Sequence, residues 1–165
     1  MLLPVNRHLR KLRAGSQDTS PTGEKRIGLV YAEIELISGD DLALNRRGFL
    51  PKEQIKRLNV NALVDSGAYM LVINQHIKEQ LDLPVLEEQT ARLADESEVR
   101  VEVVGPVEVR FENRSTTVRA MVFSGDAEVL LGAIPMEDMD VLIDPKQQRL
   151  IVNPENPYIA RKSVK

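Results

Sequence analysis

Apolar and polar residues alternate along much of the chain, as they do in β-strands that bury one face. The clearest example runs from residue 58 to residue 64, where every second residue is apolar and two asparagines lie between them. A period of two residues places all the apolar side chains on one face of a strand. The pattern therefore predicts a half-buried strand that ends directly at Asp65.

Similar signals before and after this segment predict more strands. Residues 27–37 are rich in β-formers and end at a polar turn. Beyond Pro84, alternating valines and turn residues predict an antiparallel series, in which Gly105-Pro106 separates two strands. A closing hairpin is expected near the end of the chain. The strands expected after Pro84 cover residues 89–94, 99–103, 107–112, 117–123, 141–143 and 150–152.

Three stretches carry helix signals instead. A helical turn is expected around residues 42–47. Asn74 is placed to cap a helix that continues to about Leu81, and Pro135 is placed to open a short helix over residues 136–139. The chain is therefore expected to adopt an all-β fold with two or three short helices.

Composition narrows the class of protein. The 165 residues suffice for one ordinary domain, and 42% of them are apolar, so a packed core is expected. The chain has no cysteine, which excludes disulfides, zinc-thiolate sites and a cysteine nucleophile, and makes the cytoplasm the expected compartment. No apolar run approaches the about 20 residues that span a bilayer, so no membrane association is expected.

The two ends of the chain differ in character from the middle. Residues 1–25 are expected to form a flexible basic arm, because residues 14–25 are dense in Gly, Ser, Thr and Pro. A folded domain is expected over residues 26–153, followed by an irregular tail over residues 154–165. The arm lacks interleaved aromatic residues, so nucleic acid is not expected as a partner.

The candidate chemistry lies at the end of the predicted strand, in the tripeptide Asp65-Ser66-Gly67. It is the only Asp-Ser-Gly or Asp-Thr-Gly in the chain, and it is followed by Ala68 and a second apolar run at residues 71–73. Gly67 lets the backbone turn sharply and leaves its amide open to the carboxylate. This run of residues resembles the active-site motif of the retropepsin-like aspartic peptidases.

The resemblance continues downstream and covers roughly residues 27–153. These enzymes carry a second apolar element that ends in glycine, which Leu130-Leu131-Gly132 matches, followed by a helix and a last hairpin. This stretch of sequence resembles the small single-domain members of the family from bacteria and archaea. It implies an acid-protease half-barrel with Asp65 as the catalytic residue, supported by Ser66, Gly67 and Ala68, and with Leu130, Leu131 and Gly132 packed beside that loop.

Peptide hydrolysis without a metal or a nucleophilic side chain needs a base to activate water and an acid to protonate the substrate. Two adjacent carboxyls can do both, because they cannot both ionise cheaply and so retain one proton between them. This chain offers one such motif. An active site of this kind therefore requires a second copy, and the sequence predicts a homodimeric aspartic endopeptidase that acts on polypeptides.

Two positions depart from the family pattern. The resemblance implies a flap at the turn Asp95-Glu96-Ser97, where glycine is usual in place of Glu96, although an ordinary surface turn explains the same residues. Tyr69 stands where retroviral enzymes carry an acid that holds the substrate. A catalytically silent peptide-binding dimer of the same fold therefore remains an alternative, as does, more weakly, an adaptor whose basic arm binds nucleic acid.

Neither metal nor cofactor is expected. The two histidines, His8 and His76, are isolated in the sequence, and no group of His, Asp and Glu has the spacing of metal ligands. The abundant acidic residues are expected to form a solvated surface.

Overall fold

The computed structural model describes residues 28–93 and 95–164, and most of them lie in strands. The all-β prediction is confirmed, and the helices are short. The predicted arm over residues 1–25 lies outside the described residues. The helical segments are α2 (Gly39–Arg46), η1 (Lys52–Gln54), α3 (Gln75–Gln80) and α4 (Ala133–Met139).

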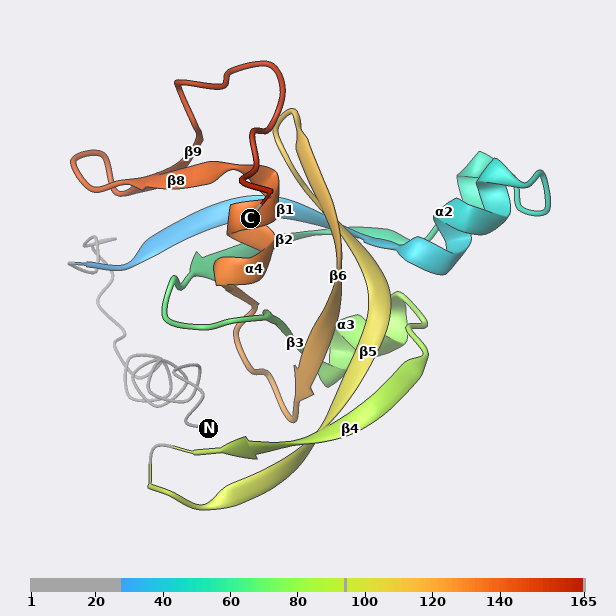
Figure 1. Cartoon of the computed structure of the whole chain (residues 1–165). Helices are drawn as coiled ribbons and strands as arrows, with labels where there is room; N and C mark the ends of the chain where they lie inside the picture. Colours follow the sequence, from blue (N-terminus) through green and yellow to red (C-terminus); the bar gives the residue numbers. More distant parts are fainter. Residues whose placement is uncertain (1–27, 94, 165) are drawn as a thin grey trace, which may run out of the picture.

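Seven strands form one sheet that closes on itself (Figure 1). Their order is β1-β2-β7-β3-β6-β5-β4, and β1 also pairs with the second half of β5, so six strands close a barrel that β4 extends. A separate hairpin consists of β8 and β9. The strands are β1 (Val30–Ser38), β2 (Arg57–Val64), β3 (Leu71–Asn74), β4 (Val85–Arg92), β5 (Glu98–Phe111), β6 (Arg114–Phe123), β7 (Leu130–Leu131), β8 (Val141–Asp144) and β9 (Arg149–Val152).

The strand that precedes Asp65 follows the predicted alternation. Ala62 and Val64 are buried in the larger core cluster, and Leu58 and Val60 pack against it. Leu63 is also buried, in a second cluster on the opposite face. The end of β2 is covered on both faces, as expected of a strand with a parallel neighbour inside a closed sheet. The backbone that delivers Asp65 is therefore held on two sides.

The prediction that Gly105-Pro106 separates two strands is wrong. A single strand, β5, runs through both residues, and its register with β6 shifts between Val104 and Val107. Proline lacks a backbone N–H, and the bulge places Pro106 where no ladder hydrogen bond is required. The continuous strand can therefore pair with β4 through its first half and with β1 through its second half.

The predicted cap of α3 is confirmed. Asn74 Oδ1 accepts a hydrogen bond from the N–H of Ile77 at 3.0 Å, which satisfies one of the unpaired amides at the helix start. The same side chain donates through Nδ2 to the carbonyl of Ala127 at 3.0 Å. Asn74 thus also fixes the segment that leads into β7.

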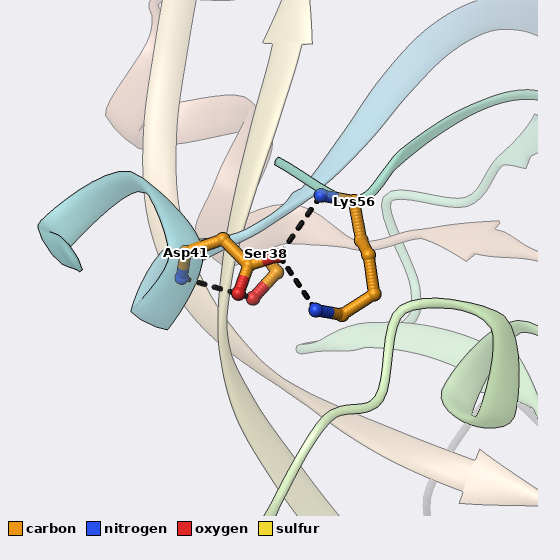
Figure 2. Close-up of polar contacts among 3 residues, drawn as sticks. All are labelled: Ser38, Asp41 and Lys56. Atoms are coloured by element: carbon orange, nitrogen blue, oxygen red, sulfur yellow. Dashed lines mark hydrogen bonds and ion pairs between the residues drawn. The ribbon is translucent and has the colours of Figure 1, made fainter. Parts of the chain in front are cut away.

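A buried polar cluster joins α2 to the start of β2 (Figure 2). Ser38 Oγ accepts from the N–H of Asp41 at 3.2 Å and caps α2. Asp41 Oδ2 accepts from the N–H and from Nζ of Lys56, each at 2.9 Å. Burial by itself raises the pKa of the Asp41 carboxyl, but the hydrogen bonds and charge of Lys56 outweigh it and hold that pKa below its ordinary value of 3.8.

We expect Asp41→Asn to lower the free energy of unfolding by about 1 to 3 kcal/mol at pH 7, because it weakens both contacts to Lys56. A lowered folded-state pKa stabilises the fold above pH 3.8 and loses that contribution as the pH falls further. The difference between the wild type and the variant should therefore shrink below about pH 4.

Urea unfolding at pH 7 and at a pH below about 4 measures the difference in free energy of unfolding between the wild type and the Asp41 variant. Asp40→Asn, one residue away and exposed, is the matched control and should change little. An equal loss at neutral and acid pH would show that the Asp41 charge does not contribute.

Candidate active site

The loop between β2 and β3 holds Asp65 through its backbone. The N–H of Asp65 donates to the carbonyl of Leu131 at 2.9 Å, and the N–H of Ala68 donates to the carbonyl of Asp65 at 3.1 Å. Gly67 N–H donates to Asp65 Oδ1 at 2.9 Å. Asp65 is 4% exposed in the single chain. The carboxyl is therefore oriented by the turn that follows it, as the sequence predicted for the amide of Gly67.

The second glycine element lies directly beside this loop. Strand β7 is inserted between β2, to which it is parallel, and β3, to which it is antiparallel. Leu130 and Leu131 are fully buried there. Beyond them, the N–H of Ala133 donates to the carbonyl of Ala68 at 2.7 Å, and the N–H of Ile134 donates to that of Tyr69 at 2.9 Å.

Gly132 makes this contact possible. A Cβ atom at position 132 would lie 2.4 Å from the carbonyl oxygen of Met70 and 2.7 Å from the carbonyl carbon of Tyr69. These are backbone atoms that a side-chain rotation cannot move away. Any side chain at this position must therefore displace the loop that carries Asp65.

Ser66, Gly67 and Ala68 of the loop differ in their exposure to solvent. Ala68 is buried in the second core cluster, which also contains Leu63 and Leu130. Ser66 and Gly67 are exposed in the single chain. The loop thus presents its serine and glycine outward, while its alanine anchors it to the barrel.

The turn Asp95-Glu96-Ser97 caps the hairpin of β4 and β5, which projects from the barrel (Figure 1). All three residues are exposed, and Ser97 N–H donates to Asp95 Oδ1 at 3.0 Å. Glu96 adopts the left-handed region with φ 67°, where glycine is favoured. Near this turn, Ala91 of β4 is buried in the second core cluster, which also contains Ala68 of the Asp65 loop.

Sequence reasoning missed the residues that fix the end of the chain. Asp140, which ends α4 in the left-handed conformation, accepts hydrogen bonds from Asn153 Nδ2 at 2.9 Å, Asn156 Nδ2 at 2.8 Å and the N–H of Arg161 at 3.0 Å. The bond from Arg161, followed by that from Asn153, lowers the pKa of the Asp140 carboxyl. No spacing rule links these residues, because the contact depends on how α4 and the tail meet.

The other features that the sequence analysis considered are the histidines, metal ligands and apolar helices. His76 is exposed on α3, and His8 lies outside the described residues. Among residues 28–93 and 95–164, no three His, Asp or Glu side chains are grouped closely enough to bind a metal ion. Within the same ranges, no helix has the length and apolarity to cross a bilayer.

A family model and a solved structure are similar to this chain. The family model described as "gag-polyprotein putative aspartyl protease" matches residues 52–137, from η1 into α4, and so includes both Asp65 and Gly132. A solved structure, the retroviral protease-like domain of Ddi1 from Leishmania major, is similar to this chain with 17% sequence identity and a TM-score of 0.49. The match spans 78% of this chain and 91% of the Ddi1 domain chain. The search of curated proteins found no match.

Proposed function

Because the chain belongs to the gag-polyprotein putative aspartyl protease family, we propose that it is a homodimeric aspartic endopeptidase. The observation that carries the proposal is the position of Asp65, the single Asp-Ser-Gly aspartate. It lies on a loop that is hydrogen-bonded to β7 and packed closely against Gly132. The substrate is an extended polypeptide.

The reaction uses the Asp65 carboxyls of two subunits as a pair. One carboxylate removes a proton from a water molecule as its oxygen bonds to the peptide carbonyl carbon, and the other carboxyl gives its proton to the carbonyl oxygen. The carbon–nitrogen bond then breaks as the first carboxyl passes the proton it took from water to the nitrogen, and the second carboxylate takes a proton back from a hydroxyl of the intermediate. Because like charges this close cannot both ionise cheaply, the pair retains the one proton that this cycle needs.

The neighbouring residues have supporting roles in this proposal. In the proposed dimer, Ser66, which is exposed in the single chain, bonds the facing loop of the second subunit, and Gly67 orients the carboxyl. Ala68 holds the loop to the barrel, and the segment Leu130–Gly132 fixes its position. The hairpin tip Asp95–Ser97 is the proposed flap, under which the peptide lies as an added strand.

The alternative is a peptide-binding dimer without catalysis. Two observations favour it: Tyr69 replaces the acid that retroviral enzymes use to hold the substrate, and Glu96 occupies a left-handed position at the flap tip. Both proposals place the protein in the cytoplasm and require the same dimer, so only catalysis separates them. The likeness to small bacterial and archaeal members stays a prediction.

Digestion of an unbiased peptide library near pH 5, followed by mass spectrometry, separates the two. The peptidase is expected to yield a reproducible set of cleavage sites that disappears when a statin-type transition-state mimic is added. If no peptide is cut between about pH 4 and pH 7 while the mimic or a peptide still binds, the silent dimer is the better account.

A further inference from the structure

Two large, mainly apolar side chains of the C-terminal tail are exposed to solvent. Tyr158 is 86% exposed and Ile159 is 79% exposed. The backbone on both sides of the pair is fixed, because Asn113 Nδ2 donates to the carbonyl of Pro157 at 2.9 Å and the N–H of Arg161 donates to Asp140 at 3.0 Å. An ordered segment that displays adjacent apolar side chains is typical of a contact surface.

A groove lies next to this segment, between α4, β6 and β8. Its volume is about 770 Å³, and residues Arg161–Ser163 of the tail form one wall. Apolar side chains line it, including Ile134 and Leu142, which are 49% and 44% exposed. Only residues 120–123 of β6 pair with β3, so the part of β6 that lines the groove, Thr116–Val118, has strand β5 on one edge only.

We propose that Tyr158 and Ile159 of one subunit insert into this groove on a second copy of the chain, and that the second copy does the same in return. In a two-fold dimer each contact occurs twice, so a chain that carries both the apolar pair and the groove is complementary to itself. The inference rests on the proposed function, because the Asp65 pair is incomplete without the second copy.

Charge also favours a second copy as the occupant. Glu137 lines the groove and is exposed, while Arg161 follows the apolar pair by two residues and is exposed as well. Neither side chain forms an ion pair with another described residue of the same chain. Insertion of the tail brings Arg161 of each subunit towards Glu137 of the other, which adds an opposite-charge contact at the rim of the interface.

The position of the groove agrees with the active site. Ile134 lines it and, through its backbone N–H, bonds the carbonyl of Tyr69 in the Asp65 loop at 2.9 Å. A partner that fills the groove therefore contacts the element that also holds the catalytic loop. The proposed interface and the Asp65 loop are therefore linked through the first turn of α4.

The apolar part of the contact is tested by the double substitution Tyr158→Ser and Ile159→Ser in the full chain. We expect its dimer dissociation constant, measured by sedimentation velocity over a range of concentrations, to rise at least about tenfold. Phe49→Ser removes an equally prominent side chain, 77% exposed near α2, and should leave the constant unchanged. A dimer that is unaffected by the double substitution overturns the proposal, as does an equal loss in the Phe49 variant.

The charged part allows a test that a merely structural effect cannot mimic. Glu137→Arg and Arg161→Glu are each expected to weaken the dimer about three- to tenfold, because like charges then meet. Mixing the two variants should restore it, since the mixed dimer pairs Arg at position 137 of one chain with Glu at position 161 of the other at one contact and keeps the native pair of Glu137 and Arg161 at the second. Mixing that gives no recovery contradicts the contact between subunits.

Peptide cleavage, measured on the same samples, keeps the two proposals apart. If the double variant remains dimeric and active, the interface is wrong and the peptidase stands. If the wild type is dimeric through this interface but does not cleave, the interface stands and the peptidase fails. Binding of the tail segment to a different protein, with the wild type monomeric at every concentration, would overturn both.

Discussion

Asp65→Asn is expected to reduce peptide cleavage at least about a thousandfold while leaving the fold and the dimer intact. The amide has the shape of the carboxyl, and its oxygen can still accept the hydrogen bond from Gly67 N–H that Asp65 Oδ1 accepts at 2.9 Å. It can neither take a proton from water nor deliver one to the substrate. The loss should therefore fall on kcat, with little change in thermal unfolding.

The matched control is Asp82→Asn. Asp82 is exposed and has φ 48°, a left-handed conformation that asparagine tolerates well, so neither fold nor cleavage should change. The measurement is kcat/KM on a peptide from the library digestion, with sedimentation and circular dichroism as checks on assembly and fold. Cleavage that persists in the purified Asp65 variant excludes this mechanism.

Gly132→Ala is expected to have the second large effect, on both stability and activity. Gly132 has φ −88°, which alanine adopts without strain, so the cost is purely steric. The added Cβ would lie 2.4 Å from the carbonyl oxygen of Met70. We expect a loss of about 2 to 4 kcal/mol in the free energy of unfolding, because backbone must shift.

The same shift moves the loop that carries Asp65, so cleavage should fall by at least about tenfold even where the variant is fully folded. Gly48→Ala is the control, since its Cβ would meet nothing within 4 Å and only its left-handed φ of 81° is strained. That variant should lose about 1 kcal/mol and no activity. A Gly132 variant as stable and active as the wild type would show that the close approach is not required.

The parts of the fold that local patterns determine were predictable. The alternation before Asp65 gave β2 its buried face, and Asn74 caps α3 because its side chain reaches an amide only three residues ahead. The position of Asp65 on a loop between two apolar strands follows from the same reasoning. Each of these features depends on residues close in sequence, where periodicity and capping rules apply.

Features that depend on distant segments were not predictable from the sequence. Gly105-Pro106 is typical of a break, yet β5 continues because a bulge in its pairing with β6 absorbs the proline. A hydrogen bond from Ile134 to Tyr69 holds the Asp65 loop, and a hydrogen bond from Asn153 to Asp140 holds the tail. Both contacts form only when the barrel is packed. No residue spacing in the sequence predicts either hydrogen bond.

Mixing wild-type chains with Asp65→Asn chains tests most directly whether two aspartates act together. When chains exchange freely between dimers, equal amounts should leave roughly a quarter of the activity of the same total amount of wild type, because only that share of dimers carries both carboxyls. Activity should follow the square of the wild-type fraction across the whole series. A linear fall, with roughly half of the activity left in the equal mixture, would mean that a single Asp65 suffices and would contradict the paired mechanism.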